Sequence, residues 1–138
     1  MFLPGSIPTE LANLSDLDTL SLEANQLSGP IPSELGLVST LNWLMLYDNN
    51  VSGTIPSELG LLTNLTWIRL EKTSLNGKIP SELTALTNID HMSLQETFIT
   101  GDLPRGFCDL IEDSGLQISL PCDQVSCDCG CMCFDSFF

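Results

Sequence analysis

Six cysteines near the C-terminus are the residues of this chain whose spacing most clearly suggests chemistry: Cys108, Cys122, Cys127, Cys129, Cys131 and Cys133. The last four occupy every second position of a short polar segment. Such a segment cannot build a core of its own, so dense cysteines favour disulfides in an oxidising compartment. Fifteen pairings of six cysteines exist, and the sequence ranks none of them.

Two other states of the cysteines stay open. The CxCxCxC run could bind a metal through thiolates, although structural zinc sites space their cysteines as C-x₂₋₄-C and no histidine lies nearby. Free thiols are the third state. The sequence favours disulfides, and we expect no metal and no other cofactor.

Catalytic motifs are absent from the sequence. His91 is the only histidine, and the chain has no GxSxG, no glycine-rich phosphate loop and no HExxH. One set of acidic residues recurs 24 positions apart, which suits helix starts and solubility better than a close acid–base pair: Glu10, Glu34, Glu58 and Glu82. We therefore expect a protein that is not an enzyme and has no catalytic residues.

The composition narrows the partners. Four Lys and Arg against 18 Asp and Glu give a net charge of −14, which disfavours nucleic acid and anionic membranes. No apolar run approaches the ~18 residues of a membrane-spanning segment. The start, MFLPGSIP, lacks the basic region of a signal peptide and opens inside a repeated phrase, which suggests a fragment or a late start.

A repeat with a period of 24 residues organises the chain. The phrase LSGPIPSELG at 27–36 returns as VSGTIPSELG at 51–60, with shorter copies before and after. The glycines keep this step at Gly5, Gly29, Gly53, Gly77 and Gly101, and a proline follows three positions later in every copy. A fixed period of this length indicates a solenoid in which each repeat stacks on its neighbours.

A second phrase, LxxLxL, recurs between the first and predicts one short parallel strand per repeat. Alternation directs one set of residues inward: Leu20, Leu22, Leu44, Leu46, Ile68, Leu70, Met92 and Leu94. It directs the intervening residues outward: Ser21, Met45, Arg69 and Ser93. A polar residue follows each strand, where the chain turns inward, and we expect its side chain to bond buried backbone groups of the turn. These residues form a row across the coils, called the ladder below: Asn25, Asn49, Thr73 and Thr97. A threonine offers one hydroxyl, so the ladder should weaken toward the C-terminus.

The resulting consensus, LxxLxxLxLxxNxLSGxIPxELGxL, resembles the plant-specific class of leucine-rich repeats, and the match covers about residues 3–110. The resemblance implies an α/β solenoid, a right-handed superhelix with short parallel strands on its concave face and 3-10 or short helical segments on the other side. Proteins of this family bind proteins, peptides or saccharides and are not catalysts.

Two regions follow from the pattern: leucine-rich repeats over 1–107, and a last strand with a cysteine-rich C-terminal cap over 108–138. The segment LQISL should be the last strand, since Leu116 and Ile118 fall 24 residues after Met92 and Leu94, and Pro121 should take the next ladder position. The ending of the chain resembles that of leucine-rich repeat proteins from diatoms and related algae, from which CDCGCMCF departs by an inserted Gly130.

Three N-x-S/T sequons, at Asn13, Asn50 and Asn64, fall outside the inward positions and are candidate glycosylation sites. With the cysteines, they favour a secreted or cell-surface protein, although chance could supply them.

A candidate binding patch lies on the predicted concave face: Trp43, Met45, Tyr47, Trp67, Arg69 and His91. Its composition is the one enriched at the centres of interfaces. The alternative is structural, with the tryptophans shielding the sheet, His91 an ordinary surface histidine, and Arg69, Glu71 and Lys72 a solvated ion-pair cluster.

We expect a monomeric binding module, extracellular or at the cell surface, for a protein, a peptide or a saccharide. The alternatives are the truncated ectodomain of a receptor or receptor kinase and a structural cell-surface protein, including an ice-binding solenoid. Ice binding would need an unbroken array of threonines, whereas Thr54, Thr73, Thr97 and Thr100 form no unbroken column on one face.

Overall fold

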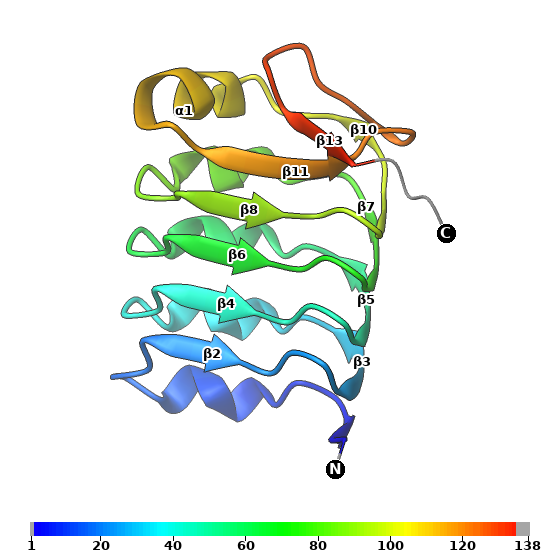
Figure 1. Cartoon of the computed structure of the whole chain (residues 1–138). Helices are drawn as coiled ribbons and strands as arrows, with labels where there is room; N and C mark the ends of the chain where they lie inside the picture. The colour runs from blue at the N-terminus through cyan, green and yellow to red at the C-terminus, as the bar shows by residue number, and fades with distance from the viewer. Residues whose placement is uncertain (1, 135–138) are drawn as a thin grey trace.

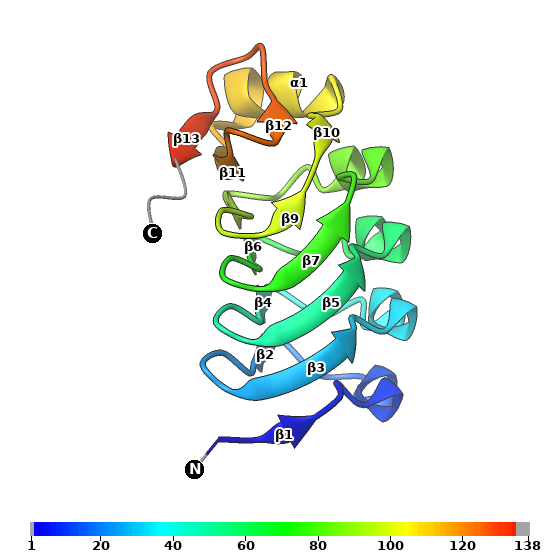
Figure 2. The same cartoon turned by 90° about the vertical axis from the view of Figure 1, so that its right-hand side faces the viewer.

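The computed structural model describes residues 2–134, in which successive repeats form the stacked coils of a solenoid (Figure 1). The N-terminal coil lies at one end of the stack and the cysteine-rich segment at the other. Each coil passes from a 3-10 helix through a short strand and a turn to a second strand on another side (Figure 2). The solenoid predicted from the period is confirmed.

The LxxLxL phrases form a parallel six-stranded sheet in the order β13-β11-β8-β6-β4-β2. Its strands are β2 (Thr19–Ser21), β4 (Trp43–Met45), β6 (Trp67–Arg69), β8 (His91–Ser93), β11 (Gln117–Pro121) and β13 (Met132–Phe134). Residues 24 apart pair directly from β2 to β8, as Leu44 does with Ile68. Equivalent side chains of neighbouring coils therefore form rows across the sheet, about 4.8 Å apart.

A second parallel sheet, which the sequence analysis did not foresee, runs through the SGxIP phrases in the order β1-β3-β5-β7-β9. Its strands are β1 (Pro4–Gly5), β3 (Gln26–Pro30), β5 (Asn50–Thr54), β7 (Ser74–Gly77) and β9 (Phe98–Ile99). Gly29, Gly53 and Gly77 have φ of 79°, 78° and 76°, a conformation that L side chains rarely adopt. The recurring glycine lets each strand bend toward the helix that follows.

Four 3-10 helices stack along the third side of the solenoid, as predicted (Figure 2): η1 (Thr9–Asn13), η2 (Ser33–Leu37), η3 (Ser57–Leu61) and η4 (Ser81–Ala85). A proline precedes each helix at the N-cap, where its missing N–H costs nothing. Gly36 and Gly60 are buried where neighbouring 3-10 helices pack closely. A Cβ at either position would overlap the backbone of the next coil, at Glu58 and Glu82 respectively.

The inward leucines form one continuous core. Leu44, Leu46, Ile68 and Leu70 are at most 1% exposed. Leu22 was expected to be fully inward but is only half-buried, because it follows β2, the edge strand of the sheet within residues 2–134. Ser93 was expected to face solvent, yet it is 3% exposed on the outer side of the sheet.

The polar side chains that follow the strands contact backbone groups. Asn49 Oδ1 accepts from Leu27 N at 3.0 Å, and its Nδ2 donates to the carbonyls of Leu22 and Leu46. Asn25 accepts similarly from Leu3 N. Thr73 and Thr97, by contrast, each donate to one carbonyl, of Leu70 and Leu94. The two asparagines thus link neighbouring coils, whereas the threonines bond mainly within their own coil.

The C-terminal end of the stack is closed by an α-helix, α1 (Gly106–Ser114), and by the strand pair β10 (Gly101–Asp102) and β12 (Val125–Ser126). LQISL was expected to be the last strand, but β13 follows it and pairs with β11. Phe107 of α1 is fully buried against the core. A helix and two short strand pairs therefore cover the apolar end of the solenoid.

The register at the last coil differs from the prediction. Ile118, not Leu116, pairs with Met92, so the step here is 26 residues. Pro121 consequently lies within β11 and pairs with Phe134, and it does not take the ladder position. The cause is α1, whose nine residues replace a five-residue 3-10 helix and lengthen the coil.

Candidate functional site

The outer side of the six-stranded sheet, called the concave face below, carries a row of stacked rings from three coils. The ring centroids of Trp43 and Trp67 lie 5.7 Å apart and their planes differ by 26°. His91 continues the row, 4.8 Å from Trp67 and 24° from its plane. The strand pairing brings these residues together, since Trp43 lies opposite Trp67 and Trp67 opposite His91. The fold thus builds one aromatic column from residues far apart in the sequence.

A second cluster lies beside this column. The guanidinium carbon of Arg69 is 4.1 Å from the centroid of the Tyr47 ring, a cation–π contact. Its Nε donates to Glu71 Oε1 at 2.8 Å, and Nη2 donates to the same oxygen. Met45, half-buried, pairs with Arg69 across β4 and β6.

The predicted solvated cluster of Arg69, Glu71 and Lys72 is therefore wrong in one respect. Glu71 is 3% exposed, whereas Lys72 is exposed at a turn with φ of 55°. A buried carboxylate needs a partner, and Arg69 supplies it. The signal in the sequence was the i, i+2 spacing of Arg69 and Glu71, which places both on one face of an extended segment.

His91 lies in a less polar environment than a surface histidine. Burial, and then the positive charge of Arg69, lower its pKa below the usual value, although Glu71 and a hydrogen bond with Gln117 act in the opposite direction. Its Nε2 lies 2.8 Å from Ser93 Oγ, which explains in part why that serine is buried. The lowered pKa favours the neutral form of the ring that stacks on Trp67.

The structure pairs all six cysteines as disulfides: Cys108 with Cys129, Cys122 with Cys133, and Cys127 with Cys131. The sulfurs of Cys127, Cys129 and Cys131 lie within 4.8 Å of one another, the arrangement that made a thiolate site conceivable. Because each sulfur is bonded to another, none is available as a thiolate ligand in this state.

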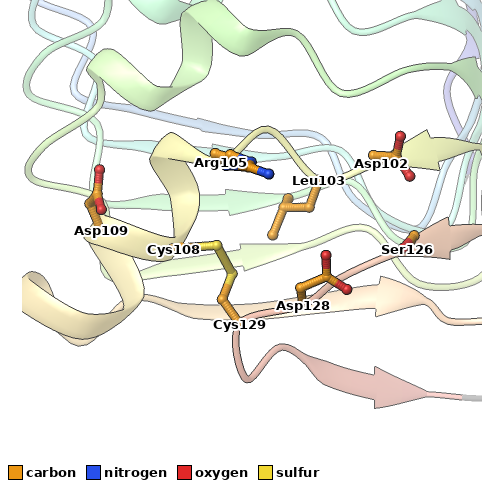
Figure 3. A pocket seen from close by; sticks show the side chains of 8 residues that line it. All are labelled: Asp102, Leu103, Arg105, Cys108, Asp109, Ser126, Asp128 and Cys129. Atoms are coloured by element: carbon orange, nitrogen blue, oxygen red, sulfur yellow. A yellow bond between two sulfur atoms is a disulfide. The ribbon is translucent and has the colours of Figure 1, made fainter.

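A cleft of about 590 Å³ lies in the cap, lined by Asp102, Leu103, Arg105, Cys108, Asp109, Ser126, Asp128 and Cys129 (Figure 3). The Cys108–Cys129 disulfide joins α1 to the segment that carries Asp128 at one side of this cleft. Its polar groups are carboxylates, one hydroxyl and one guanidinium, with no aromatic ring. The cleft lacks the preorganised aromatic surface that the concave face presents.

The three sequon asparagines, Asn13, Asn50 and Asn64, are all exposed, on η1, on β5 and between η3 and β6. Asn64 Nδ2 donates to the carbonyl of Ser39 at 2.9 Å, a contact that a glycan would remove or rearrange. Within residues 2–134, none of the helices has both the length and the apolar character needed to cross a bilayer.

The model of the Leucine Rich Repeat family matches residues 16–37 and 40–62 of the chain. Among solved structures, the chain is similar to the leucine-rich repeat ectodomain of the membrane receptor kinase GASSHO1/SCHENGEN3 from Arabidopsis thaliana, in complex with CASPARIAN STRIP INTEGRITY FACTOR 2. The two share 30% identity over 86% of this chain, with a TM-score of 0.79.

Two further structures are similar over 86% of the chain, each with a TM-score of 0.80. They are the plant peptide hormone receptor RGFR1 in complex with RGF2, at 34% identity, and a plant ice-binding protein, at 31% identity. The chain spans 15% of the first ectodomain, 20% of the hormone receptor and 38% of the ice-binding protein. A comparison with curated proteins found no match.

Proposed function

Since the chain belongs to the leucine-rich repeat family in its plant-type form, we propose that it is a non-catalytic module that binds a protein or peptide on its concave face. The observation that carries the proposal is the ordered column Trp43–Trp67–His91 beside the Tyr47–Arg69 contact. Tryptophan, tyrosine and arginine are the residues that most often dominate binding energy.

The geometry supports binding because these side chains are already ordered. Each ring is held by stacking on the next, and Arg69 is held by Tyr47 and Glu71. A partner that meets preorganised side chains loses less conformational entropy than one that must order them. Trp43, 43% exposed, offers the largest accessible ring of the column.

The comparisons support the class of partner. RGFR1 is described as a peptide hormone receptor and was solved with RGF2, and GASSHO1/SCHENGEN3 was solved with CASPARIAN STRIP INTEGRITY FACTOR 2. This chain covers a small part of either, so the partner of the present chain is our proposal. A saccharide that stacks on the same rings is the alternative ligand.

We further propose an extracellular or cell-surface location, glycosylation at Asn13, Asn50 or Asn64, and a monomeric protein with the repeats over 1–107 and the cap over 108–138. Three disulfides need an oxidising compartment to persist, which supports the location. The exposure of the sequons supports their accessibility. The alternative of a truncated receptor ectodomain remains compatible with the short coverage of the receptors.

The proposed function is tested by immobilising the chain, exposing it to extracellular medium and identifying the proteins that it captures after covalent cross-linking. The Trp67→Ala variant should lose the captured partner while keeping its circular dichroism spectrum. Leu61→Ala is the control, since Leu61 is 62% exposed on η3, away from the concave face. Equal capture by the chain and by Trp67→Ala would contradict the proposal.

The similarity to a plant ice-binding protein favours ice binding as a second candidate. The expected threonine array is not supplied by Thr73 and Thr97, which are 5% and 4% exposed. Thr54 and Thr100 are exposed, on β5 and after β9. Thermal hysteresis of the purified chain decides between the two: a freezing-point gap that disappears in Thr54→Tyr would favour ice binding.

A further inference from the structure

A groove of about 540 Å³ lies where successive coils pass from the second sheet into their 3-10 helices. Figure 2 shows this junction at the ends of β3 and β5, each of which leads into the helix that follows. Three equivalent segments line the groove, within 6–9, 30–34 and 54–58. None of the lining residues belongs to the concave face or to the C-terminal cap, so the groove is separate from both surfaces described above.

Prolines form much of the apolar wall of this groove. Pro30, Pro32 and Pro56 line it together with Ile7 and Ile31. The backbone nitrogen of a proline carries no hydrogen, and its ring restricts the backbone. The wall is therefore a rigid apolar surface without donors from the prolines, which suits the aliphatic part of a ligand.

Two carboxylates line the same groove. Glu34 and Glu58 are both exposed and occupy equivalent positions in the first turns of η2 and η3. Across residues 2–134 the ion pair found is Arg69–Glu71, so neither carboxylate is paired with a cation there. An ionised carboxylate only accepts hydrogen bonds. A ligand that fits the groove therefore has to supply donors and positive charge.

We infer that this groove is a second interaction surface, which binds a basic segment of a protein partner through its lysine or arginine side chains. Such a side chain has an aliphatic stem and a cationic head. The stem packs on the proline wall, and the head donates hydrogen bonds to Glu34 or Glu58. The inference goes beyond the proposed function, because the groove lies on another side of the solenoid.

Charge argues against other occupants. The first turn of a helix favours negative charge, but Glu34 and Glu58 already supply it there and would repel an anion. A second copy of the chain carries the same net charge of −14, so two copies would repel each other. That charge instead favours the approach of a basic partner.

The extent of the groove sets the size of the segment. Its lining spans three coils, and strands of neighbouring coils lie about 4.8 Å apart, so the groove extends over roughly 10 Å. An extended chain rises about 3.3 Å per residue, so about three residues cover this length. The first and third side chains of such a segment point to the same side. Two basic residues in these places can therefore face the two carboxylates together.

The probe is a capped Lys-Val-Lys tripeptide, titrated into the ¹⁵N-labelled chain at low salt. The amide signals of Ser33, Glu34 and Glu58 should shift, while the indole signals of Trp43 and Trp67 on the concave face should not. Acetylation of both lysine side chains keeps the stems, removes the charges and should weaken binding about 5- to 10-fold. Diaminobutyrate in place of each lysine keeps the charge, shortens the stem and should weaken binding about 5-fold.

Two variants test the geometry. Glu34→Gln/Glu58→Gln should weaken binding of the lysine peptide about 5- to 10-fold and leave binding of the acetylated peptide unchanged. Its matched control is Asp48→Asn/Glu96→Gln, which removes the same charge at two exposed residues outside the groove and should bind as the unmodified chain does. Thr54→Tyr places a larger side chain in the groove lining and should weaken binding of both peptides.

Equal affinity for the lysine and acetyl-lysine peptides would overturn the inference, as would equal binding by Glu34→Gln/Glu58→Gln and its control. Shifts confined to the indole signals of Trp43 and Trp67 would place the peptide on the concave face and also reject the groove. Groove amides that shift with chain concentration alone would assign the groove to a second copy of the chain instead. None of these outcomes decides the concave-face function, which the capture experiment with Trp67→Ala tests separately.

Discussion

The guanidinium carbon of Arg69 lies 4.1 Å from the centre of the Tyr47 ring, one coil away, while Nε of the same group donates to Glu71. The contact joins a half-buried aromatic residue to a carboxylate that is 3% exposed. One side chain thus neutralises a buried charge and orders the concave face. Stability and the proposed recognition surface are coupled through Arg69.

Removing Arg69 should therefore destabilise the fold. Arg69→Met leaves the Glu71 carboxylate buried and unpaired, and we expect a loss of about 1–3 kcal/mol in the free energy of unfolding, measured by urea denaturation. The double variant Arg69→Met/Glu71→Gln should recover much of this loss, because no buried charge remains. A double variant as unstable as the single one would show that the ion pair itself is not the cause.

Asn49 should be more sensitive to substitution than Asn25. Asn49→Thr keeps a hydroxyl that can donate to the Leu46 carbonyl, as Thr73 does to Leu70, but Leu27 N loses its acceptor. We expect a cost of about 1–3 kcal/mol in unfolding free energy. Asn25→Thr is the control and should cost less, because Leu3 N, its partner, is exposed to water in the terminal coil. Equal costs would show that burial of the asparagine hydrogen bonds does not determine their contribution to stability.

Gly60 tests the close packing of the 3-10 helices. A Cβ there would overlap the carbonyl oxygen of Glu82 on the next helix, so Gly60→Ala should force the coils apart. Overpacking of this kind costs about 1–3 kcal/mol and should appear as a lower melting temperature. Ser81→Ala, at an exposed position of η4, provides the comparison and should melt close to the unmodified chain. A stable Gly60→Ala would mean that the helices separate easily.

The lowered pKa of His91 makes stability depend on pH. Burial, with help from Arg69, disfavours the protonated ring in the folded chain. The unfolded chain therefore takes up its proton first as the pH falls through about 6.5. The His91 contribution is complete above that pH and decreases below it, until the folded chain is protonated too.

A melting-temperature series from pH 8 to pH 5 measures this effect against His91→Gln. Carboxylates also titrate toward the lower end of this range, so the difference between the two chains is the informative quantity. We expect the unmodified chain to lose slightly more stability than the variant as the pH falls. Parallel curves would show that protonation of His91 does not differ between the folded and unfolded states.

The Cys122–Cys133 disulfide should hold the last strand in place. It joins the residue after β11 to β13 with a Cα separation of 5.2 Å, whereas Cys127–Cys131 closes a span of only 4 residues. In Cys122→Ser/Cys133→Ser, the amides of β11 and β13 should exchange with deuterium much faster. Cys127→Ser/Cys131→Ser is the matched pair and should change exchange there little. Faster exchange of β11 and β13 in Cys127→Ser/Cys131→Ser alone would show that the Cys127–Cys131 disulfide holds the last strand instead.

Residues that recur with the period could be interpreted from the sequence because their surroundings recur too. A fixed step of 24 places equal positions of neighbouring coils side by side. It therefore predicts the burial of Leu44, Ile68 and Asn49 and the pairing of Trp43 with Trp67. Leu22 departs from the pattern because it follows β2, the edge strand of the six-stranded sheet in residues 2–134.

The structure of the C-terminal cap could not be predicted in this way, because its residues do not follow the 24-residue repeat. The shift of Ile118 opposite Met92 depends on a helix that the repeat does not contain. β13 pairs in parallel with β11 after a connection through β12 that no period specifies. The disulfide pairing likewise depends on which sulfurs the closed coil brings together.

By itself the sequence determined the solenoid, its strand positions, the polar residues behind the strands and the row of tryptophans, because all of these depend on local alternation and on one period. Only the tertiary structure decided that Glu71 is buried and paired with Arg69, and that His91 stacks on Trp67 while its Nε2 lies within hydrogen-bond distance of Ser93. Burial and contacts between coils depend on residues that are far apart in the sequence, and only the folded structure brings these residues together.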